Sequence, residues 1–520
     1  MSHPTQTALL PAKDDCFTTS TVPEQLSFTL DRADLPGLRG VVSKLAGPGY
    51  AEKRVTERLG LEDLADLNWR WLPVHRAEHL AARDPLDLAV DLFLLQGILP
   101  AGELERLFAA DERDVLIHSG LLAIDETGSA RARASLFPVV DHLIFSDHAW
   151  PSLPHPGQAT VPFDQVMGVG LDSRLLARCT PRRPFRAALD LCTGSGVHAL
   201  LASTHTEKVL AVDINPRAVR CASFNAHISG ASNLQALPGD LYEAAPGECF
   251  DLITANPPFV PSPLNTLGFR DGGRSGEDIL KRIVAGLPHH LAPGGIAQIV
   301  TELGERDDEP LVRRLRQWLD GAPMDIRILR LGQYSAMKYA IGHAKGDDYQ
   351  TFLDSIKDWA ANLRAQGYVR VASLVISFQW SDAAFGPPWE RVDESPPPHR
   401  DADAEIDAIF RAERAARRPD RQQVLRQSWL RRAGPIALID ARVLGSGLHA
   451  KAKATLLGQA LRIEHQLDPV EREILDRMGE RIPVPDLIAM FRDLGVDEAG
   501  VLAAARSLLQ RPLVHLDGKF

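Results

Sequence analysis

The tetrapeptide Asn256-Pro257-Pro258-Phe259 carries the groups needed to hold a planar nitrogen. The Asn256 side-chain oxygen and the Pro257 carbonyl can each accept a hydrogen bond from an NH2 group. The Phe259 ring offers an apolar face on which an amide or a base could pack. The motif therefore predicts a clamp for an NH2 group. The alternative is a loop that the prolines merely stiffen after a strand.

A glycine-rich turn precedes this clamp and follows a strand predicted for residues 186–191. Asp190 ends that strand, and Thr193, Gly194 and Gly196 form the turn. Glycines let the backbone pass close to a ligand at the start of a helix. A lone G-x-G is weak evidence, and the third glycine of the dinucleotide fingerprint is missing, which disfavours a nicotinamide cofactor.

Two acidic residues end the next two predicted strands. Asp213, followed by Ile214, ends the strand predicted for residues 208–212, where a carboxylate can accept both ribose hydroxyls of an adenosine. Asp240, followed by Leu241, ends a third strand and could accept from an adenine amino group. Helix capping is the alternative for Asp213, and an ordinary turn is the alternative for Asp240. Together with the glycine turn, these acids predict an adenosine across the carboxyl edge of a parallel sheet.

With these motifs in order, the chain resembles the class I S-adenosylmethionine-dependent methyltransferases that carry an N-P-P-[FY] motif, over residues 164–301. Residues 189–196 and 256–261 are most similar to the glutamine N5-methyltransferases of release factors and ribosomal protein, and residues 271–276 match the segment that follows the motif there. Those enzymes commonly have Tyr where this chain has Phe259. Phenylalanine is also the choice of the related guanine N2-methyltransferases of ribosomal RNA.

The resemblance implies a methyl transfer by in-line displacement, with S-adenosylmethionine as the cofactor and alignment of the reactants supplying much of the acceleration. The catalytic residues it implies are Asn256, Pro257, Pro258 and Phe259. The cofactor-binding residues it implies are Asp190, Thr193, Gly194, Gly196, Asp213, Ile214, Asp240, Leu241 and Asn256, with no metal. Residues 166–173 occupy the place of a lid over the methionine end of the cofactor, or form a turn without ligand contact. For Asn225, which recurs in the family, an exposed helical position is the simpler interpretation.

Residues 146–385 alternate apolar runs with helix-length segments, which predicts an α/β, doubly wound, Rossmann-like parallel sheet. The resemblance implies seven strands. Strands are predicted at residues 186–191, 208–212, 250–255, 296–301, 325–331 and 369–378. The helical stretch 335–366 is interpreted as a surface elaboration, in preference to a cover over the substrate.

Two mainly helical, winged-helix-like domains are predicted to flank the catalytic region, at residues 1–145 and 401–520. The first is interpreted as a packing module in preference to a nucleic-acid or peptide reader. The proline-rich residues 386–400 are predicted to be a linker without regular structure. Helices are predicted at 87–95, 103–108, 111–122, 469–478, 484–494 and 497–509, and strands at 122–124, 132–138 and 513–515.

Bulk properties exclude several classes of protein. The 520 residues, 45% hydrophobic and 24% charged, fit a soluble globular chain of about three domains. A net charge of -10 gives no overall attraction to phosphate backbones, so nucleic acid is possible as a partner but not favoured. The five cysteines lack C-x-x-C spacing, which disfavours zinc and disulfides. No signal peptide or membrane span is predicted, so we expect a cytoplasmic protein without a membrane partner.

The leading prediction is an S-adenosylmethionine-dependent N-methyltransferase acting on a side-chain amide, glutamine-like, of a protein or peptide. The first alternative is the same reaction on an exocyclic amine of a nucleobase in ribosomal RNA or DNA. A small-molecule acceptor and a non-catalytic binding protein that keeps the fold are further alternatives. The sequence leaves the oligomeric state open.

Overall fold

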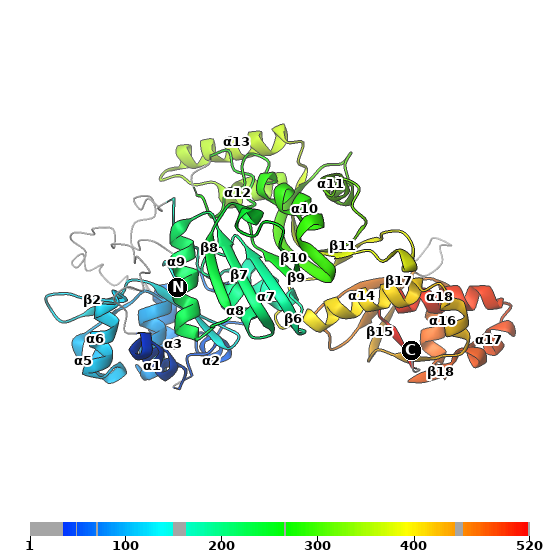
Figure 1. Cartoon of the computed structure of the whole chain (residues 1–520), viewed down its shortest axis with the longest axis horizontal. Helices are drawn as coiled ribbons and strands as arrows, with labels where there is room; N and C mark the ends of the chain where they lie inside the picture. The colour runs from blue at the N-terminus through cyan, green and yellow to red at the C-terminus, as the bar shows by residue number, and fades with distance from the viewer. Residues whose placement is uncertain are drawn as a thin grey trace, which may run out of the picture.

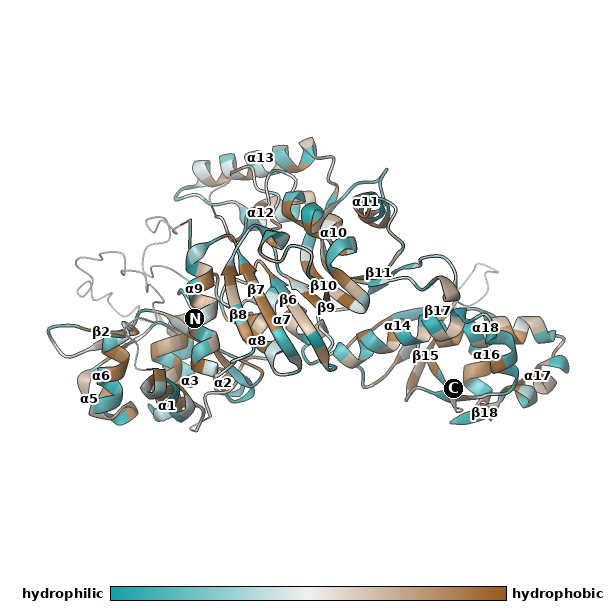
Figure 2. Cartoon of the chain, viewed as in Figure 1, coloured by the Kyte–Doolittle hydropathy of each residue, from teal (hydrophilic) through white to brown (hydrophobic). Residues whose placement is uncertain are grey.

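A central α/β region lies between an N-terminal, mainly helical region and a C-terminal region of helices and short strands (Figure 1). The computed structural model describes residues 35–47, 49–68, 71–148, 163–264, 267–441 and 451–517. Apolar residues concentrate on the central strands, while outer helices such as α13 and α14 carry polar residues on their open sides (Figure 2). Within the described ranges, no helix is both long and apolar enough to cross a membrane.

The central region is built on an eight-stranded mixed sheet in the order β13-β11-β12-β10-β9-β6-β7-β8. Its strands are β6 (Phe185–Leu191), β7 (Thr206–Asp213), β8 (Leu234–Pro238), β9 (Phe250–Ala255), β10 (Leu291–Glu305), β11 (Met324–Ser335), β12 (Arg370–Trp380) and β13 (Glu390–Glu394). The five strands from β10 to β8 are mutually parallel. β12 runs antiparallel to both of its neighbours, and β13 pairs with β11 in parallel.

The predicted strands of the central region are all present, but two predictions about the sheet are wrong. The sheet has eight strands instead of seven, and β12 makes it mixed instead of parallel. An apolar run marks a buried strand without encoding its direction, so sequence periodicity could not find this. The predicted linker 386–400 contains β13, which pairs on one side only. An edge strand tolerates the prolines that flank it here, at 387–388 and 396–398.

Helices cover both faces of the sheet. Successive side chains of a strand point to opposite faces, and the central strands carry apolar residues on both. Leu189 of β6 packs in one buried cluster with α10 (Asp278–His290) and α11 (Leu311–Trp318). The preceding Ala188 packs in another cluster with α7 (Leu171–Cys179) and α14 (Asp403–Arg417). α8 (Val197–Ser203) and α9 (Pro216–Ser229) connect β6 to β7 and β7 to β8. Because β6 to β10 run parallel, their carboxyl ends lie along one edge of the sheet.

The N-terminal region shares its core with the central region. Its elements are α1 (Leu35–Ala46), α2 (Glu52–Arg58), α3 (Leu72–His79), α4 (Pro85–Ala89) continuing as a π-helical turn (Val90–Leu94), β1 (Ile98–Leu99), α5 (Ala101–Leu107), α6 (Ala110–His118), β2 (Leu122–Ile124), β3 (Ala130–Ala132), β4 (Ser135–Val139) and β5 (His142–Ser146). One buried cluster runs from α1 to Leu200 of α8 and Phe224 of α9. β2 pairs with β3, while β4 pairs with β5. Most of the strand predicted at 132–138 is present as β4, but its predicted pairing with 122–124 was wrong, because the partner of β2 is β3. The winged-helix-like character stays a prediction.

The predicted helical stretch 335–366 forms α12 (Ala336–His343) and α13 (Tyr349–Ala365). One buried cluster joins Phe259 to Tyr339 of α12 and Trp359 of α13. Asn362 of α13 donates hydrogen bonds to the carbonyls of Pro261 and Arg274, at 3.1 and 2.9 Å. The interpretation of this stretch as a surface elaboration was wrong, because it packs directly on the loop that follows β9. We call α12 and α13 together the helical insert.

The C-terminal region contains the three predicted helices, the strand predicted at 513–515, which forms β19 (Val514–Asp517), and, among the described residues, five further short strands that the sequence analysis did not predict. Its elements after α14 are α15 (Arg421–Arg426), β14 (Trp429–Arg432), β15 (Ile436–Ala441), β16 (Lys451–Leu456), β17 (Glu464–Leu467), α16 (Pro469–Arg477), β18 (Arg481–Pro483), α17 (Val484–Arg492), α18 (Glu498–Gln510) and β19 (Val514–Asp517). The sheets have the orders β18-β14-β19 and β15-β16-β17. Its winged-helix-like character also stays a prediction.

Candidate active site at the carboxyl edge of the sheet

A cavity of about 500 Å³ opens where β6, β7, β8 and β9 end. The predicted site residues that line it are Thr193, Gly194, Asp213, Ile214, Asp240, Leu241, Asn256 and Pro258. The connections from β6 and from β9 leave in opposite directions along the sheet, which creates the crevice where α/β sheets bind ligands. Asp190, Gly196, Pro257 and Phe259 do not line the cavity.

The two glycines of the turn after β6 serve different purposes. Gly194 has φ +55° and lines the cavity, and a Cβ built on it would meet no atom within 4 Å. Gly196 has φ +81°, and its Cβ would lie 2.9 Å from the Cβ of Ala222 in α9. Gly194 thus gives a ligand access to the backbone, whereas Gly196 lets α8 and α9 approach each other.

Asp190 is a structural residue of the turn, and the structure does not support the prediction that it binds the cofactor. Its side chain is buried, and its carboxylate accepts hydrogen bonds from the Thr193 hydroxyl at 2.5 Å, the Thr254 hydroxyl at 2.8 Å and the Ala199 amide at 3.2 Å. Burial raises the pKa of Asp190 to about 6, against the opposing effect of these donors. Both oxygens are therefore engaged in holding β6, β9 and α8 around the turn.

Asp213 joins the second strand to the glycine turn at the cavity wall. One carboxylate oxygen accepts from the Gly194 amide and the other from the Asn215 amide, both at 2.9 Å. Burial raises the pKa of Asp213. The cap of α9 is Asn215, whose side chain accepts from the Arg217 amide, so capping does not explain Asp213. Each oxygen of a carboxylate has a second lone pair, which leaves Asp213 able to accept from a ligand.

At the β8 end of the cavity, Asp240 forms an ion pair with Arg282 of α10 at 2.9 Å. Sequence reasoning missed Arg282, because it lies on α10, far along the chain from Asp240. Cys192 and Leu241 both line the cavity with φ of +55°, a left-handed conformation that non-glycine residues rarely adopt. Such strained positions concentrate at ligand sites.

At the opposite, β9 end of the cavity, the loop after β9 presents Asn256 in a fixed orientation. The Nδ2 atom of Asn256 donates to the hydroxyl of Ser173 at the start of α7, over 3.2 Å. Both side chains and Pro258 line the cavity. With Nδ2 bound to Ser173, the oxygen Oδ1 is the Asn256 atom left to accept from an NH2 group. Phe259 is buried against the helical insert, so its predicted stacking on the acceptor stays a prediction.

The segment predicted as a lid runs along the cavity wall. Val166 and Met167 line the cavity, as do the aromatic side chains of Phe163 and Phe269, which sequence reasoning missed. The Asn215 amide group donates to the Asp164 carbonyl at 2.8 Å and ties this segment to the end of β7. Its role over the cofactor stays a prediction.

The interpretation of Asn225 as an exposed helical residue was wrong. Its side chain is fully buried in α9. Oδ1 accepts from the Phe145 amide at 2.9 Å, and Nδ2 donates to the carbonyls of Phe145 and Ser195 at 2.8 Å each. Asn225 thus fastens the N-terminal region, through β5, to the glycine turn. Only the folded arrangement brings these three segments together.

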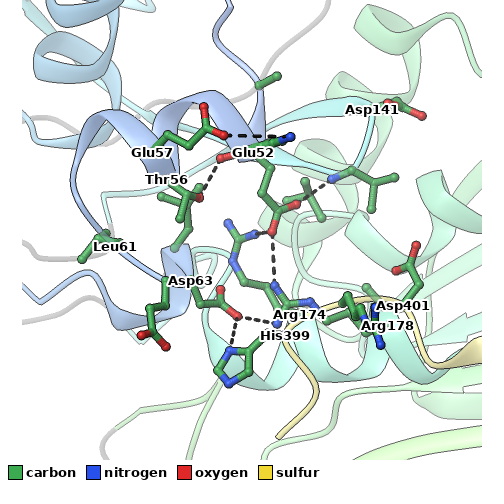
Figure 3. Close-up of a pocket in the computed structure, with 18 residues that line it drawn as sticks. Glu52, Thr56, Glu57, Leu61, Asp63, Asp141, Arg174, Arg178, His399 and Asp401 are labelled. Atoms are coloured by element: carbon green, nitrogen blue, oxygen red, sulfur yellow. Dashed lines mark hydrogen bonds and ion pairs between the residues drawn. The ribbon is translucent and has the colours of Figure 1, made fainter. Parts of the chain in front are cut away.

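A second cleft, of about 560 Å³, lies between α2 of the N-terminal region and α7 (Figure 3). There Glu52 binds Arg174 and Arg178, and Asp63 also binds Arg178. The Arg174 side chain is 1% exposed. Arg178 donates further to the Pro398 carbonyl at 3.0 Å. We call these four charged side chains the α7 clamp, because they hold the helix that carries Ser173.

Comparison with known proteins agrees with this geometry. Residues 167–317 match the family described as methyltransferase small domain. A candidate protein N5-glutamine methyltransferase of Methanocaldococcus jannaschii is 35% identical over 136 residues, which cover 25% of this chain and 68% of that protein. The chain belongs to the methyltransferase small domain family. The family recognised from the sequence motifs is thereby confirmed.

Other members of the methyltransferase small domain family match over a smaller share of their length. The ribosomal protein uL3 glutamine methyltransferase of Bordetella pertussis is 36% identical over 163 residues, 28% of this chain and 53% of that enzyme. The release factor glutamine methyltransferase of Xylella fastidiosa is 39% identical over 122 residues, 21% of this chain and 44% of that enzyme. This chain thus spans about half the length of these relatives. The family match ends before the helical insert and the C-terminal region.

Proposed function

We propose that this protein is an S-adenosylmethionine-dependent N-methyltransferase that methylates a glutamine-like side-chain amide of a protein or peptide in the cytoplasm. The observation that carries the proposal is the orientation of Asn256, whose Oδ1 is left to accept from an NH2 group at one end of the cavity. The names of the relatives, which are glutamine methyltransferases, support the amide as acceptor.

The residues of the cavity fit S-adenosylmethionine. Asp213 offers carboxylate lone pairs to ribose hydroxyls, and Asp240 could accept from the adenine amino group at the far end. The cofactor would supply an electrophilic methyl group on a sulfonium. Asn256, at the opposite end from Asp240, would accept from the amide NH2 and fix the direction of its nitrogen. Positioning of this kind contributes several kcal/mol to catalysis. Among the described residues, no group of three or more His, Cys, Asp or Glu side chains could hold a metal ion.

Two variants separate binding from transfer. Asp213→Ala is expected to weaken the binding of S-adenosylmethionine, measured by isothermal titration. Asn256→Ala is expected to bind the cofactor like the wild type and to lose methyl transfer, because it lacks the oxygen that orients the acceptor. No binding by the wild type, or near-normal turnover by Asn256→Ala, would refute the proposal. Labelled methyl transfer into a lysate, resolved into protein, RNA and small molecules, identifies the acceptor class.

A specific surface favours a nucleobase acceptor as the second candidate. On β14, Trp429 and Arg431 are exposed. Arg431 lies opposite Arg481 of β18 and His515 of β19, and the Arg481 guanidinium lies 5.0 Å from the centre of the Trp429 ring. Cationic and aromatic groups side by side suit a single-stranded RNA. RNA binding that weakens steeply with salt, and that Arg431→Ala weakens, would support this candidate.

The flanking regions are proposed to be winged-helix-like and to help recognise the acceptor. In the N-terminal region, β1 precedes α5 and α6 and β2 follows them, and both strands pair with β3. In the C-terminal region, β14 lies between β18 and β19 in the sheet, with α16 between β14 and β18 along the chain and α17 and α18 between β18 and β19. Both arrangements have the helix and strand content of a winged helix. Removal of either region is expected to affect recognition of the acceptor.

A further inference from the structure

Glu302 lies on the side of Asn256 that faces away from the predicted cofactor residues. It belongs to β10, which pairs in parallel with β9 up to Ala255, the residue before Asn256. β6, β7 and β8, which carry Gly194, Asp213 and Asp240 at their ends, lie on the other side of β9. Along the carboxyl edge, Asn256 therefore stands between the cofactor residues and the end of β10.

Two neighbours link Glu302 to the Asn256 loop. The Tyr339 hydroxyl of the helical insert donates to Oε2 of Glu302 at 2.6 Å, and the Tyr339 ring packs in one buried cluster with Phe259. On the other side, the charge of Asp172 interacts with that of Glu302. Asp172 directly precedes Ser173, which binds Asn256. Asp172 and Glu302 are both of intermediate exposure as whole residues.

The charge environment of Glu302 favours proton exchange near neutrality. The pKa of Glu302 is raised to about 7, mainly by burial and in part by the charge of Asp172, while the Tyr339 hydroxyl and Arg270 act in the opposite direction. Burial also raises the pKa of Asp172, to about 6. Glu305, three residues further along β10, instead forms ion pairs with Arg330 and Arg370. Among the described residues, no arginine or lysine forms an ion pair with Glu302, whose side chain accepts a hydrogen bond from the Tyr339 hydroxyl.

We propose that Glu302 is a catalytic residue that accepts the proton lost by the acceptor nitrogen, with Asp172 and Tyr339 as the positioning residues that set its proton affinity. This inference rests on the proposed methyl transfer. The nitrogen forms a bond to the methyl carbon as the carbon–sulfur bond breaks and its electron pair stays on sulfur. As positive charge develops on the nitrogen in this transition state, its proton passes to the Glu302 carboxylate and onward to solvent.

A carboxylate of this proton affinity suits the task. A general base works best when its pKa lies near the operating pH, and proton transfer to a positioned base typically contributes about 100-fold to 10,000-fold. The helical insert then has a chemical reason to pack on the loop after β9. Through Tyr339 it holds Glu302, and through Phe259 it holds the clamp for the amide.

The main test is the pH profile of methyl transfer to a glutamine-containing acceptor. This acceptor is first identified by fractionating a lysate that the enzyme has methylated. In the wild type, kcat/KM is expected to rise with pH through about 7, because only ionised Glu302 accepts a proton. Glu302→Gln is expected to lose about 100-fold at pH 8 and to lose this rise, with S-adenosylmethionine binding unchanged by titration calorimetry. Glu305→Gln, the matched control on the same strand, is expected to keep the profile.

Two near-isosteric variants must shift the profile in opposite directions. Asp172→Asn removes a negative charge that raises the pKa of Glu302, so the rise moves to lower pH. Tyr339→Phe removes a donor that stabilises the carboxylate, so the rise moves to higher pH. A purely structural role for either residue would lower kcat/KM at every pH without moving the profile. That outcome, or a Glu302→Gln profile equal to that of the wild type, would overturn the inference.

A second measurement needs neither cofactor nor activity. Infrared difference spectra between the wild type and Glu302→Gln, recorded across pH, isolate the Glu302 carboxyl, which is expected to ionise near 7 in the protein without ligand. Ionisation near the ordinary value of 4.5 would overturn the inference. If the wild type transfers no methyl group, the proposed function fails. The titration separates that failure from an error about Glu302.

Discussion

The Nδ2 atom of Asn256 donates a hydrogen bond to the Ser173 hydroxyl over 3.2 Å, so a residue at the start of α7 sets the orientation of the proposed acceptor clamp. The two residues are 83 positions apart in the sequence. The contact exists because α7 packs on β10, which is the neighbour of β9 in the sheet. The proposed chemistry of the Asn256 motif therefore depends on how α7 is held.

Ser173→Ala tests this relationship. Loss of one hydrogen bond costs about 1 kcal/mol, and we expect methyl transfer to fall roughly fivefold to tenfold. Cofactor affinity should change little, since the bond orients the acceptor clamp. Turnover and calorimetric titration measure the two effects. Ser203→Ala, which removes a hydroxyl bound to the Leu200 carbonyl at the end of α8, is the control and should leave both unchanged.

Asp190→Ala is expected to lower the free energy of unfolding by about 3 kcal/mol or more, because buried donors on Thr193, Thr254 and Ala199 lose their acceptor. Urea denaturation followed by circular dichroism measures the loss. Asp382→Ala removes an exposed carboxylate that accepts from a single amide, and should cost about 1 kcal/mol or less. Equal losses in the two variants would contradict the structural role of Asp190.

The two glycines of the turn should separate folding from ligand binding. Gly196→Ala combines φ +81° with a clash against Ala222 and should destabilise the protein by roughly 1 to 3 kcal/mol. Gly194→Ala meets no atom within 4 Å but has to adopt φ +55°, so it should cost about 1 kcal/mol, less than Gly196→Ala, and should weaken the binding of S-adenosylmethionine at the cavity wall. Thermal unfolding and calorimetric titration measure the two effects. The reverse pattern would show that these roles were assigned wrongly.

Glu52→Ala should disrupt the α7 clamp by leaving Arg174 buried without its carboxylate partner. Removing one partner of a buried ion pair typically costs about 3 to 5 kcal/mol. We expect faster hydrogen exchange in residues 171–179 and reduced methyl transfer. Glu57→Ala on the same helix breaks only an exposed pair with Lys53 and should have no measurable effect. Unchanged exchange in α7 after Glu52→Ala would contradict the clamp.

Glu302→Gln should change stability in a way that depends on pH. The folded-state pKa of Glu302, about 7, lies above its ordinary value of 4.5. The folded state therefore favours the protonated acid, and this stabilisation is complete below about 4.5 and is lost as pH rises through about 7. The melting temperature of the variant, relative to the wild type, should thus be higher at pH 8 than at pH 5. Glu305→Gln loses two ion pairs and should be less stable at both pH values.

The part of the site built from strand ends could be predicted from the sequence. Gly194, Asp213, Asp240 and Asn256 each follow an apolar run that forms a parallel strand, and the carboxyl ends of parallel strands meet at one edge. Local spacing was sufficient to place these residues in one cavity. The same reasoning assigned Asp190 to the ligand, because a sequence does not show which side of a turn a carboxylate faces.

The sequence by itself determined the family, the positions of the parallel strands along the chain and most of the cavity residues that follow them, because each depends on short motifs and apolar runs. Only the tertiary structure decided that β12 is antiparallel, that Asn225 is buried and that the helical insert packs on Phe259. It alone brought Glu302 to Tyr339 and Asp172. These contacts join residues far apart in the chain, and their burial and charge coupling arise only when the chain is folded.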